Sequence, residues 1–159
     1  MKLSITSLVL FLCFSSTILA QDRFSVTVTK VSDGDTFWAT DTKGENIKFR
    51  PIGFNCPEES NFGKPAEPYN EEATSYTESM IMDKTIYVEY DVQKTDKWGR
   101  HLVYVYLEDG KMLNEEILKD GWAELATYPP NVKYVERFKD AYRNARVSEQ
   151  GMWKESIKN

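Results

Sequence analysis

The sequence predicts one α+β domain in which five β-strands form a barrel and three α-helices pack around it. Two observations lead to this prediction. Five short segments have the side-chain alternation or the β-branched, apolar composition of strands. One helical segment falls between the third and fourth strands, and two more follow the fifth. The length of 159 residues is ordinary for a single domain.

The first three strands are predicted in the N-terminal part of this domain. Residues 24–31 alternate apolar and polar side chains and are rich in β-branched types. A turn at 32–34 leads to a second strand over 36–40. A hairpin turn at 42–45 leads to a third strand over 46–52. The pattern therefore predicts a meander of three neighbouring strands.

The middle of the chain is predicted to hold a helix and the last two strands. A loop rich in Pro, Gly, Asn and Glu covers 55–68, and apolar residues recur at helical spacing over 70–82. Strands are predicted over 85–91 and 102–107, joined by a polar connection at 95–100. Since residues 102–107 are apolar throughout, this strand is expected to be central and buried on both faces.

The C-terminal part is predicted to be helical. A short helix is expected over 112–120 and a longer one over 133–149, where the apolar residues form one stripe. Gly151 is expected at the C-terminal cap of the longer helix. Five strands with helices in this order are typical of a five-stranded OB-fold β-barrel with three α-helices.

Residues 1–20 differ in kind from the rest of the chain. Lys2 is followed by an apolar run, and Ala20 precedes an abrupt change to polar residues. This pattern predicts a secretory signal peptide at 1–20 and a folded domain at 21–159. The alternatives are an uncleaved membrane anchor and a lipoprotein anchor at Cys13. We expect a secreted or periplasmic protein without a stable membrane anchor.

The charge and the cysteines limit the kind of protein further. Without Lys2, the 20 basic residues become 19 against 25 acidic ones, a net charge of about −6. This balance disfavours a passive nucleic-acid binder but permits an enzyme with a local basic cleft. Only Cys56 remains after the predicted signal peptide, so no intramolecular disulfide is expected, and the hydrophobic core must stabilise the domain.

Several catalytic chemistries are excluded by the residues that the chain lacks. His101 is its only histidine, which excludes two-histidine acid–base catalysis and multi-histidine zinc sites. Cys56 has no neighbour in the sequence that would activate it as a nucleophile. The remaining candidates are acids and arginines near strand ends. Each has an ordinary explanation when taken alone, as a turn residue or as a solvated charge.

Taken together, the polar motifs of the chain are far more specific. They comprise Asp33-Gly34-Asp35-Thr36, Arg50 with Pro57-Glu58, Thr95 through Arg100, Leu113-Asn114-Glu115 with Gly121, and Gly151-Met152-Trp153. In this order and spacing they resemble the staphylococcal nuclease (thermonuclease) family over nearly all of residues 24–155. The resemblance implies an OB-fold barrel with three helices. It also implies a calcium-dependent nuclease acting on DNA and RNA, with 3′-phosphate products, and we expect a monomer.

The resemblance assigns catalysis to Arg50, Glu58 and Arg100, all of which are present. A carboxylate such as Glu58 can act as general base towards the attacking water. Two guanidinium groups suit the negative charge that grows on the phosphoryl oxygens. The resemblance therefore predicts a general base beside a phosphate clamp.

The family's metal site maps onto Asp35, Asn55 and Cys56, and here the sequence departs from the family pattern. Asn55 stands where a second aspartate is usual, and Cys56 stands in place of a threonine whose main-chain carbonyl is the ligand. An amide oxygen can still bind Ca²⁺, but one formal charge is missing. We therefore expect weaker calcium binding than in relatives with the aspartate.

The resemblance places Lys97, Trp98 and Tyr128 at the substrate pocket. Stacking of bases on aromatic rings tolerates any sequence, which suits a nuclease of broad specificity. Ala126 stands where the family often has a second tyrosine, so that contact is not expected. The alternative function is a catalytically weak or inactive OB-fold module that binds nucleic acid. A second alternative is a secreted structural or interaction domain unrelated to nucleic acid.

Overall fold

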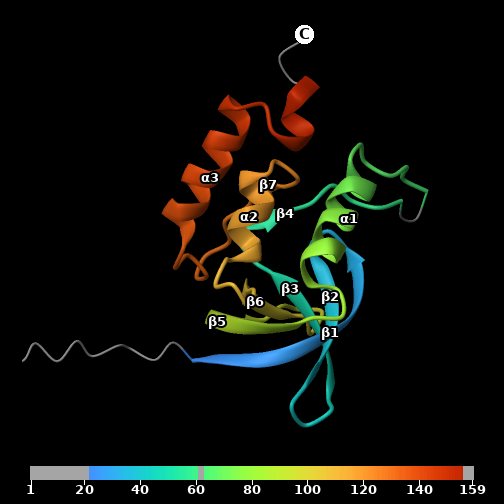
Figure 1. Ribbon diagram of the computed structural model, residues 1–159, viewed down its shortest axis with the longest axis vertical. Coiled ribbons are helices and arrows are strands. Elements are labelled where there is room, and N and C mark those ends of the chain that lie inside the picture. Colours follow the sequence, from blue (N-terminus) through green and yellow to red (C-terminus); the bar gives the residue numbers. More distant parts are fainter. Residues whose placement is uncertain (1–21, 61–62, 156–159) are drawn as a thin grey trace, which may run out of the picture.

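The computed structural model describes residues 22–60 and 63–155, so the predicted signal peptide at 1–20 lies outside the described residues. Five strands close into a barrel in the order β1-β2-β3-β6-β5, with the helices on one side of it (Figure 1). The strands are β1 Arg23–Asp33, β2 Thr36–Asp41, β3 Asn46–Pro51, β5 Thr85–Thr95 and β6 His101–Tyr106. The predicted five-stranded barrel is confirmed.

The barrel closes because β1, the first strand in this order, also pairs with β5, the last. Its first residues pair with β5 over Arg23–Thr27, and Val26–Asp33 pair with β2. Register shifts between Val28 and Lys30 and between Val31 and Asp33 mark irregularities in this long strand. Such bulges increase the local twist and bend of a strand, which lets one strand serve two neighbours.

Three α-helices cover the barrel, as predicted: α1 Asn70–Ile81, α2 Leu113–Lys119 and α3 Val135–Val147. α2 packs against α3, whereas α1 packs against β1 (Figure 1). Within the described ranges, no helix is long and apolar enough to cross a membrane. Three short elements were not predicted: β4 Phe54–Asn55, β7 Glu124–Leu125 and the 3₁₀ helix η1 Gly151–Glu155.

The prediction that Gly151 caps α3 is wrong. The helix ends at Val147, and Gly151 instead begins η1 with a φ of +52°. A Cβ atom at this position would lie 2.4 Å from the carbonyl oxygen of Gly121. Glycine is therefore required where two backbone segments pass each other, not where a helix stops.

The core consists of two clusters of buried side chains. One fills the barrel interior and includes Phe37 and Phe49, whose rings stack with centroids 5.3 Å apart. The other lies between the barrel and the helices and includes Phe54, Cys56 and Phe138. The second cluster matters for function because it fixes the backbone of β4, which borders the cleft described below.

A polar network around Glu89 joins the barrel to the start of α3. Glu89 is only 3% exposed, and its carboxylate accepts hydrogen bonds from the hydroxyls of Tyr106 and Tyr134 and from Lys133 Nζ. Burial opposes ionisation of Glu89, but these donors outweigh it and lower the pKa of the carboxyl group. A buried charge with this many partners stabilises the fold only while it stays ionised.

We predict that Glu89→Gln lowers the free energy of unfolding by about 2 kcal/mol at pH 7. Because the folded pKa lies below the usual value of 4.5, the stabilisation is complete above that pH and is lost as the pH falls below it. Urea unfolding between pH 3 and pH 7 measures both effects. The exposed Glu45→Gln is the control, and equal stability of the two variants at pH 7 would contradict the prediction.

Candidate active site

A cleft of about 490 Å³ opens at one edge of the barrel. All three predicted catalytic residues, Arg50, Glu58 and Arg100, line it. Its lining also contains most of the predicted metal and substrate residues, namely Asp35, Asn55, Trp98 and Tyr128. Cys56 and Lys97 are not part of the lining, although both are adjacent in sequence to residues that are.

The strand pairing explains why residues far apart in sequence meet here. β3 and β6 run parallel, with Phe49 opposite His101 and Arg50 opposite Leu102. Arg50 and the segment that leads into β6, including Arg100, therefore reach the same edge of the barrel. The turn between β1 and β2 supplies Asp35 to this edge.

The Asp-Gly-Asp turn between β1 and β2 is tightly packed. The amide of Asp35 donates to Asp33 Oδ1 at 3.0 Å, and Thr77 Oγ1 donates to the carbonyl oxygen of Gly34 at 2.7 Å. A Cβ atom on Gly34 would lie 2.7 Å from Cys56 Sγ, so only glycine fits between the turn and Cys56. The turn is thus held in place from both sides.

The buried side chain of Cys56 packs beneath this turn. Burial raises the pKa of its thiol far above the usual range, and the nearby Asp35 carboxylate raises it further. The thiol therefore stays protonated at neutral pH and cannot act as a nucleophile. Its backbone N–H donates to Asp35 Oδ2 at 2.9 Å, which ties β4 to the turn.

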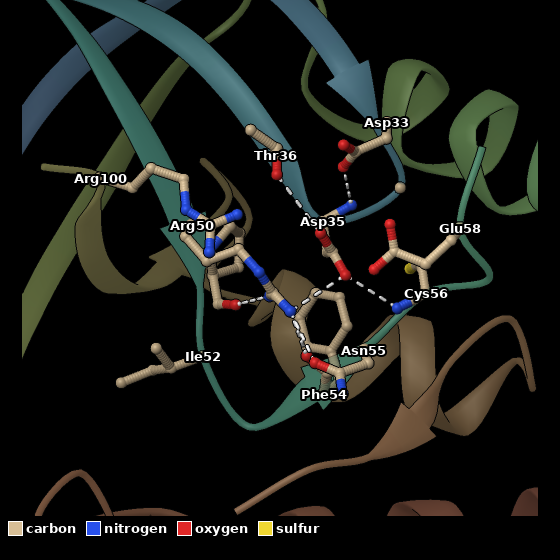
Figure 2. A network of polar contacts seen from close by, with 12 residues as sticks. Asp33, Asp35, Thr36, Arg50, Ile52, Phe54, Asn55, Cys56, Glu58 and Arg100 are labelled. Atoms are coloured by element: carbon tan, nitrogen blue, oxygen red, sulfur yellow. Dashed lines mark hydrogen bonds and ion pairs between the residues drawn. The ribbon is translucent and has the colours of Figure 1, made fainter. Parts of the chain in front are cut away.

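Arg50 is held by acceptors on several sides (Figure 2). Its Nη2 atom lies 3.0 Å from Asp35 Oδ2, 2.7 Å from Asn55 Oδ1 and 3.1 Å from the carbonyl oxygen of Phe54. Nη1 donates to the carbonyl oxygen of Pro51. These contacts fix the guanidinium in a single position at the base of the cleft.

Asp33 and Asp35 crowd two carboxyl groups into one turn. Burial raises the pKa of Asp33 to about 6, and the neighbouring charge of Asp35 adds to this effect. Asp35 itself is bound by Arg50, by the amide of Cys56 and by the hydroxyl of Thr36 at 3.3 Å. The turn therefore holds one well-paired carboxylate beside one that lacks a basic partner in the cleft lining.

Arg100 is positioned by Asp96. Its Nε atom donates to Asp96 Oδ2 at 2.7 Å, while the other carboxylate oxygen accepts from the amides of Trp98 and Arg100. Burial opposes ionisation of Asp96, but these donors outweigh it and lower the pKa of its carboxyl group. Since the ion pair uses Nε, the Nη edge of Arg100 can serve another acceptor. Sequence reasoning missed this role of Asp96.

Glu58 begins an exposed loop beyond β4. Its carboxylate points towards Asp35 in Figure 2. Its backbone N–H donates to Glu67 Oε2 at 3.0 Å, and the amide of Glu67 donates to the carbonyl oxygen of Glu58 at 2.9 Å. Glu67 was not predicted as a site residue, because a contact across nine residues of loop leaves no periodic signal.

The predicted substrate residues differ in position. Trp98 and Tyr128 are 69% and 65% exposed, and both line the cleft. Lys97 lies outside the lining, with its Nζ atom 4.3 Å from the centre of the Trp98 ring. The loop that carries Tyr128 is tied to β5 because Asn131 exchanges two hydrogen bonds with the backbone of Gln93, at 2.8 and 2.9 Å.

The cleft lining holds more acidic than basic side chains. Four carboxylates (Asp33, Asp35, Glu58, Asp96) face two guanidinium groups (Arg50, Arg100). Asp35 and Asp96 each pair with one arginine, which leaves two carboxylates without a basic partner in the lining. In the described part of the chain, no three Asp, Glu, His or Cys side chains cluster closely enough to hold a metal. The available oxygens nevertheless suit a hard divalent cation, because it would balance this charge.

Comparison with known proteins gives a consistent result over most of the chain. A family described as "Staphylococcal nuclease homologue" matches residues 48–155. The chain is 38% identical to a thermonuclease of Staphylococcus hyicus over 127 residues, which cover 79% of this chain and 73% of that protein. It is 35% identical to a thermonuclease of Staphylococcus intermedius over 129 residues, 81% and 76% of the two chains. Endonuclease YncB of Bacillus subtilis is 31% identical over 134 residues, 83% and 63%.

Proposed function

Because the chain belongs to the family of staphylococcal nuclease homologues and is a phosphodiesterase by that membership, we propose that it is a calcium-dependent nuclease that cuts DNA and RNA. One observation carries this proposal. Two arginines and an exposed glutamate, supplied by separate segments of the chain, line the same cleft. The relatives that are named thermonucleases and endonucleases support the same reaction class.

We assign the role of general base to Glu58. Its side chain is exposed, so a water molecule can approach it, and its backbone is held by Glu67 on both its N–H and its carbonyl oxygen. A carboxylate held in this way can orient an attacking water and accept its proton. As the water attacks phosphorus, its proton would pass to the carboxylate of Glu58.

Arg50 and Arg100 would stabilise the charge that develops on the phosphoryl oxygens. Each is fixed in advance by a carboxylate, Asp35 and Asp96 respectively, so neither has to reorganise during the reaction. We propose that Arg100 also stabilises the leaving oxygen. The bond that breaks would be P–O5′, so that the 5′ oxygen leaves and the phosphate stays on the 3′ oxygen of the other product, as the family resemblance implies.

The proposed cation site is formed by Asp35, the side-chain oxygen of Asn55 and the main-chain carbonyl of Cys56. The amide oxygen of Asn55 has a second lone pair besides the one that accepts from Arg50. A bound calcium ion would supply polarisation of the phosphoryl group and balance the excess negative charge of the cleft. The missing formal charge at Asn55 favours the second candidate function, a binding module with little activity, because a weaker cation site would lower catalysis.

Substrate binding is proposed to rest on Trp98, Lys97 and Tyr128. Both aromatic side chains are exposed at the cleft, where unstacked bases can pack on them. Lys97 would contribute positive charge beside Trp98. We further propose that residues 1–20 direct export, and that the domain acts as a monomer in the medium or in a periplasm.

We predict that the domain cuts denatured DNA and RNA in calcium and not in a chelator. Glu58→Gln and Arg100→Ala should each lower kcat by about 10²–10³, because each removes one preorganised group. The exposed Glu59→Gln is the matched control and should keep the wild-type rate. Uncut substrate at millimolar calcium, with binding retained, would support the binding module instead.

A second prediction concerns the cation. Asn55→Asp should tighten calcium binding about tenfold, because it adds a formal charge to the ligand set. Isothermal titration calorimetry measures this affinity without any substrate. Asn46→Asp adds the same charge at an exposed position on β3 and should leave calcium affinity unchanged. The absence of a gain in Asn55→Asp would remove Asn55 from the proposed site.

A further inference from the structure

Asn55 joins two residues of the cleft lining that come from distant parts of the sequence. Its Oδ1 atom accepts a hydrogen bond from Arg50 Nη2 at 2.7 Å, and its Nδ2 atom lies 3.2 Å from the hydroxyl oxygen of Tyr128. Arg50 and Tyr128 are 78 residues apart in sequence, yet this one amide contacts both. Figure 2 shows the amide oxygen of Asn55 facing Arg50 and its nitrogen facing away.

The chemistry of Arg50 fixes the orientation of this amide. A guanidinium group has five N–H donors and no acceptor, so the group that faces it must be the oxygen of Asn55. The NH₂ group of Asn55 is then left to face Tyr128. Since an NH₂ group can only donate, the Tyr128 oxygen is the acceptor in this hydrogen bond.

The direction of this hydrogen bond means that the Tyr128 proton does not point at Asn55. A hydroxyl that accepts from Asn55 keeps its own O–H proton for a different acceptor. Tyr128 is 65% exposed and lines the same cleft as Arg50 and Arg100. Its proton is therefore free to meet an anionic group that enters the cleft.

We propose that Asn55 is a positioning residue that turns the Tyr128 hydroxyl into a donor for a phosphate of the bound strand. This inference rests on the proposed function, because it takes the cleft to bind nucleic acid. The donated proton would meet a non-bridging phosphate oxygen, and a hydrogen bond to a charged oxygen is stronger than one between neutral groups. Arg50 and Tyr128 would then act on the same strand through one shared amide.

An aspartate at position 55 would reverse this arrangement. An ionised carboxylate only accepts hydrogen bonds, so it would draw the Tyr128 proton towards itself. The oxygen lone pairs of Tyr128 would then face the phosphate and repel it. The carboxylate would also add a fifth acidic group to the four that already line the cleft. Asn55 thus favours binding of the nucleic-acid strand, whereas an aspartate at this position would favour binding of the cation.

The backbone around Tyr128 is held independently of Asn55. The backbone N–H of Asn131 donates to the carbonyl oxygen of Tyr128 at 3.1 Å, and the side chain of Asn131 is hydrogen-bonded to the backbone of Gln93 on β5. A change at Asn55 should therefore alter the direction of the hydroxyl proton while leaving the ring in place. Mutation of Asn55 and Tyr128 can therefore measure how much the direction of this proton contributes to binding of the strand.

The test is a double-mutant cycle of Asn55→Asp and Tyr128→Phe, with the affinity for a short single-stranded oligothymidylate as the readout. Calorimetry in EDTA keeps the strand intact and removes any effect of the cation. Tyr128→Phe should weaken binding about tenfold in the wild-type background. In the Asn55→Asp background, the same change should weaken binding less than twofold, because the proton no longer faces the phosphate.

Tyr87→Phe is the control, because Tyr87 is an exposed tyrosine on β5 that lies outside the cleft lining. It should leave the affinity unchanged. An unaltered affinity of Tyr128→Phe would overturn the inference, and so would an equal loss in both backgrounds. Cleavage by the wild-type domain in calcium is measured separately. Coupling between the two mutations in EDTA, without any cleavage in calcium, would overturn the proposed nuclease activity and leave the inferred role of Asn55 intact.

Discussion

Arg50 and Asp35 form an ion pair at the base of the cleft, and the proposed cation ligands Asn55 and Cys56 are both bonded to one of these two side chains. Both are largely buried, with side chains 12% and 11% exposed, so water screens their attraction only weakly. Each also has further partners, since Asp35 accepts from the Cys56 amide and Arg50 donates to Asn55. Removal of either partner would leave a buried charge and cost about 3–5 kcal/mol.

The fold keeps this pair in place through its strand order and its second core cluster. Parallel pairing of β3 with β6 brings Arg50 and Arg100 to one edge of the barrel. Cys56 fills the space below Gly34, which fixes the turn that presents Asp35. Two positively charged groups can then line the same acidic cleft, because each is fixed by its own carboxylate. The proposed stabilisation of phosphoryl charge by the two arginines depends on this arrangement.

The five strands and three helices could be predicted from the sequence, because most of them are long enough to carry a period of 2 or 3.6. The barrel itself was predicted from the order of these elements and from the family resemblance. The sequence could not reveal β4, β7 or η1, which are too short for a pattern, and it misplaced the role of Gly151, whose need for glycine arises from Gly121. The candidate site residues could be named from motifs. The contacts of Asn55 could not, because Tyr128 lies 73 residues away and the direction of a hydrogen bond has no sequence signal.

The proposed catalysis depends above all on the fixed guanidinium of Arg50, and replacement by a residue of the same charge tests this dependence. Arg50→Lys keeps the positive charge opposite Asp35 but loses the planar donor fork. Turnover of denatured DNA in calcium should fall about 10²–10³-fold, with the domain still folded by urea unfolding. A folded Arg50→Lys variant whose turnover stays within a few-fold of the wild-type value would show that positive charge alone is sufficient at this position.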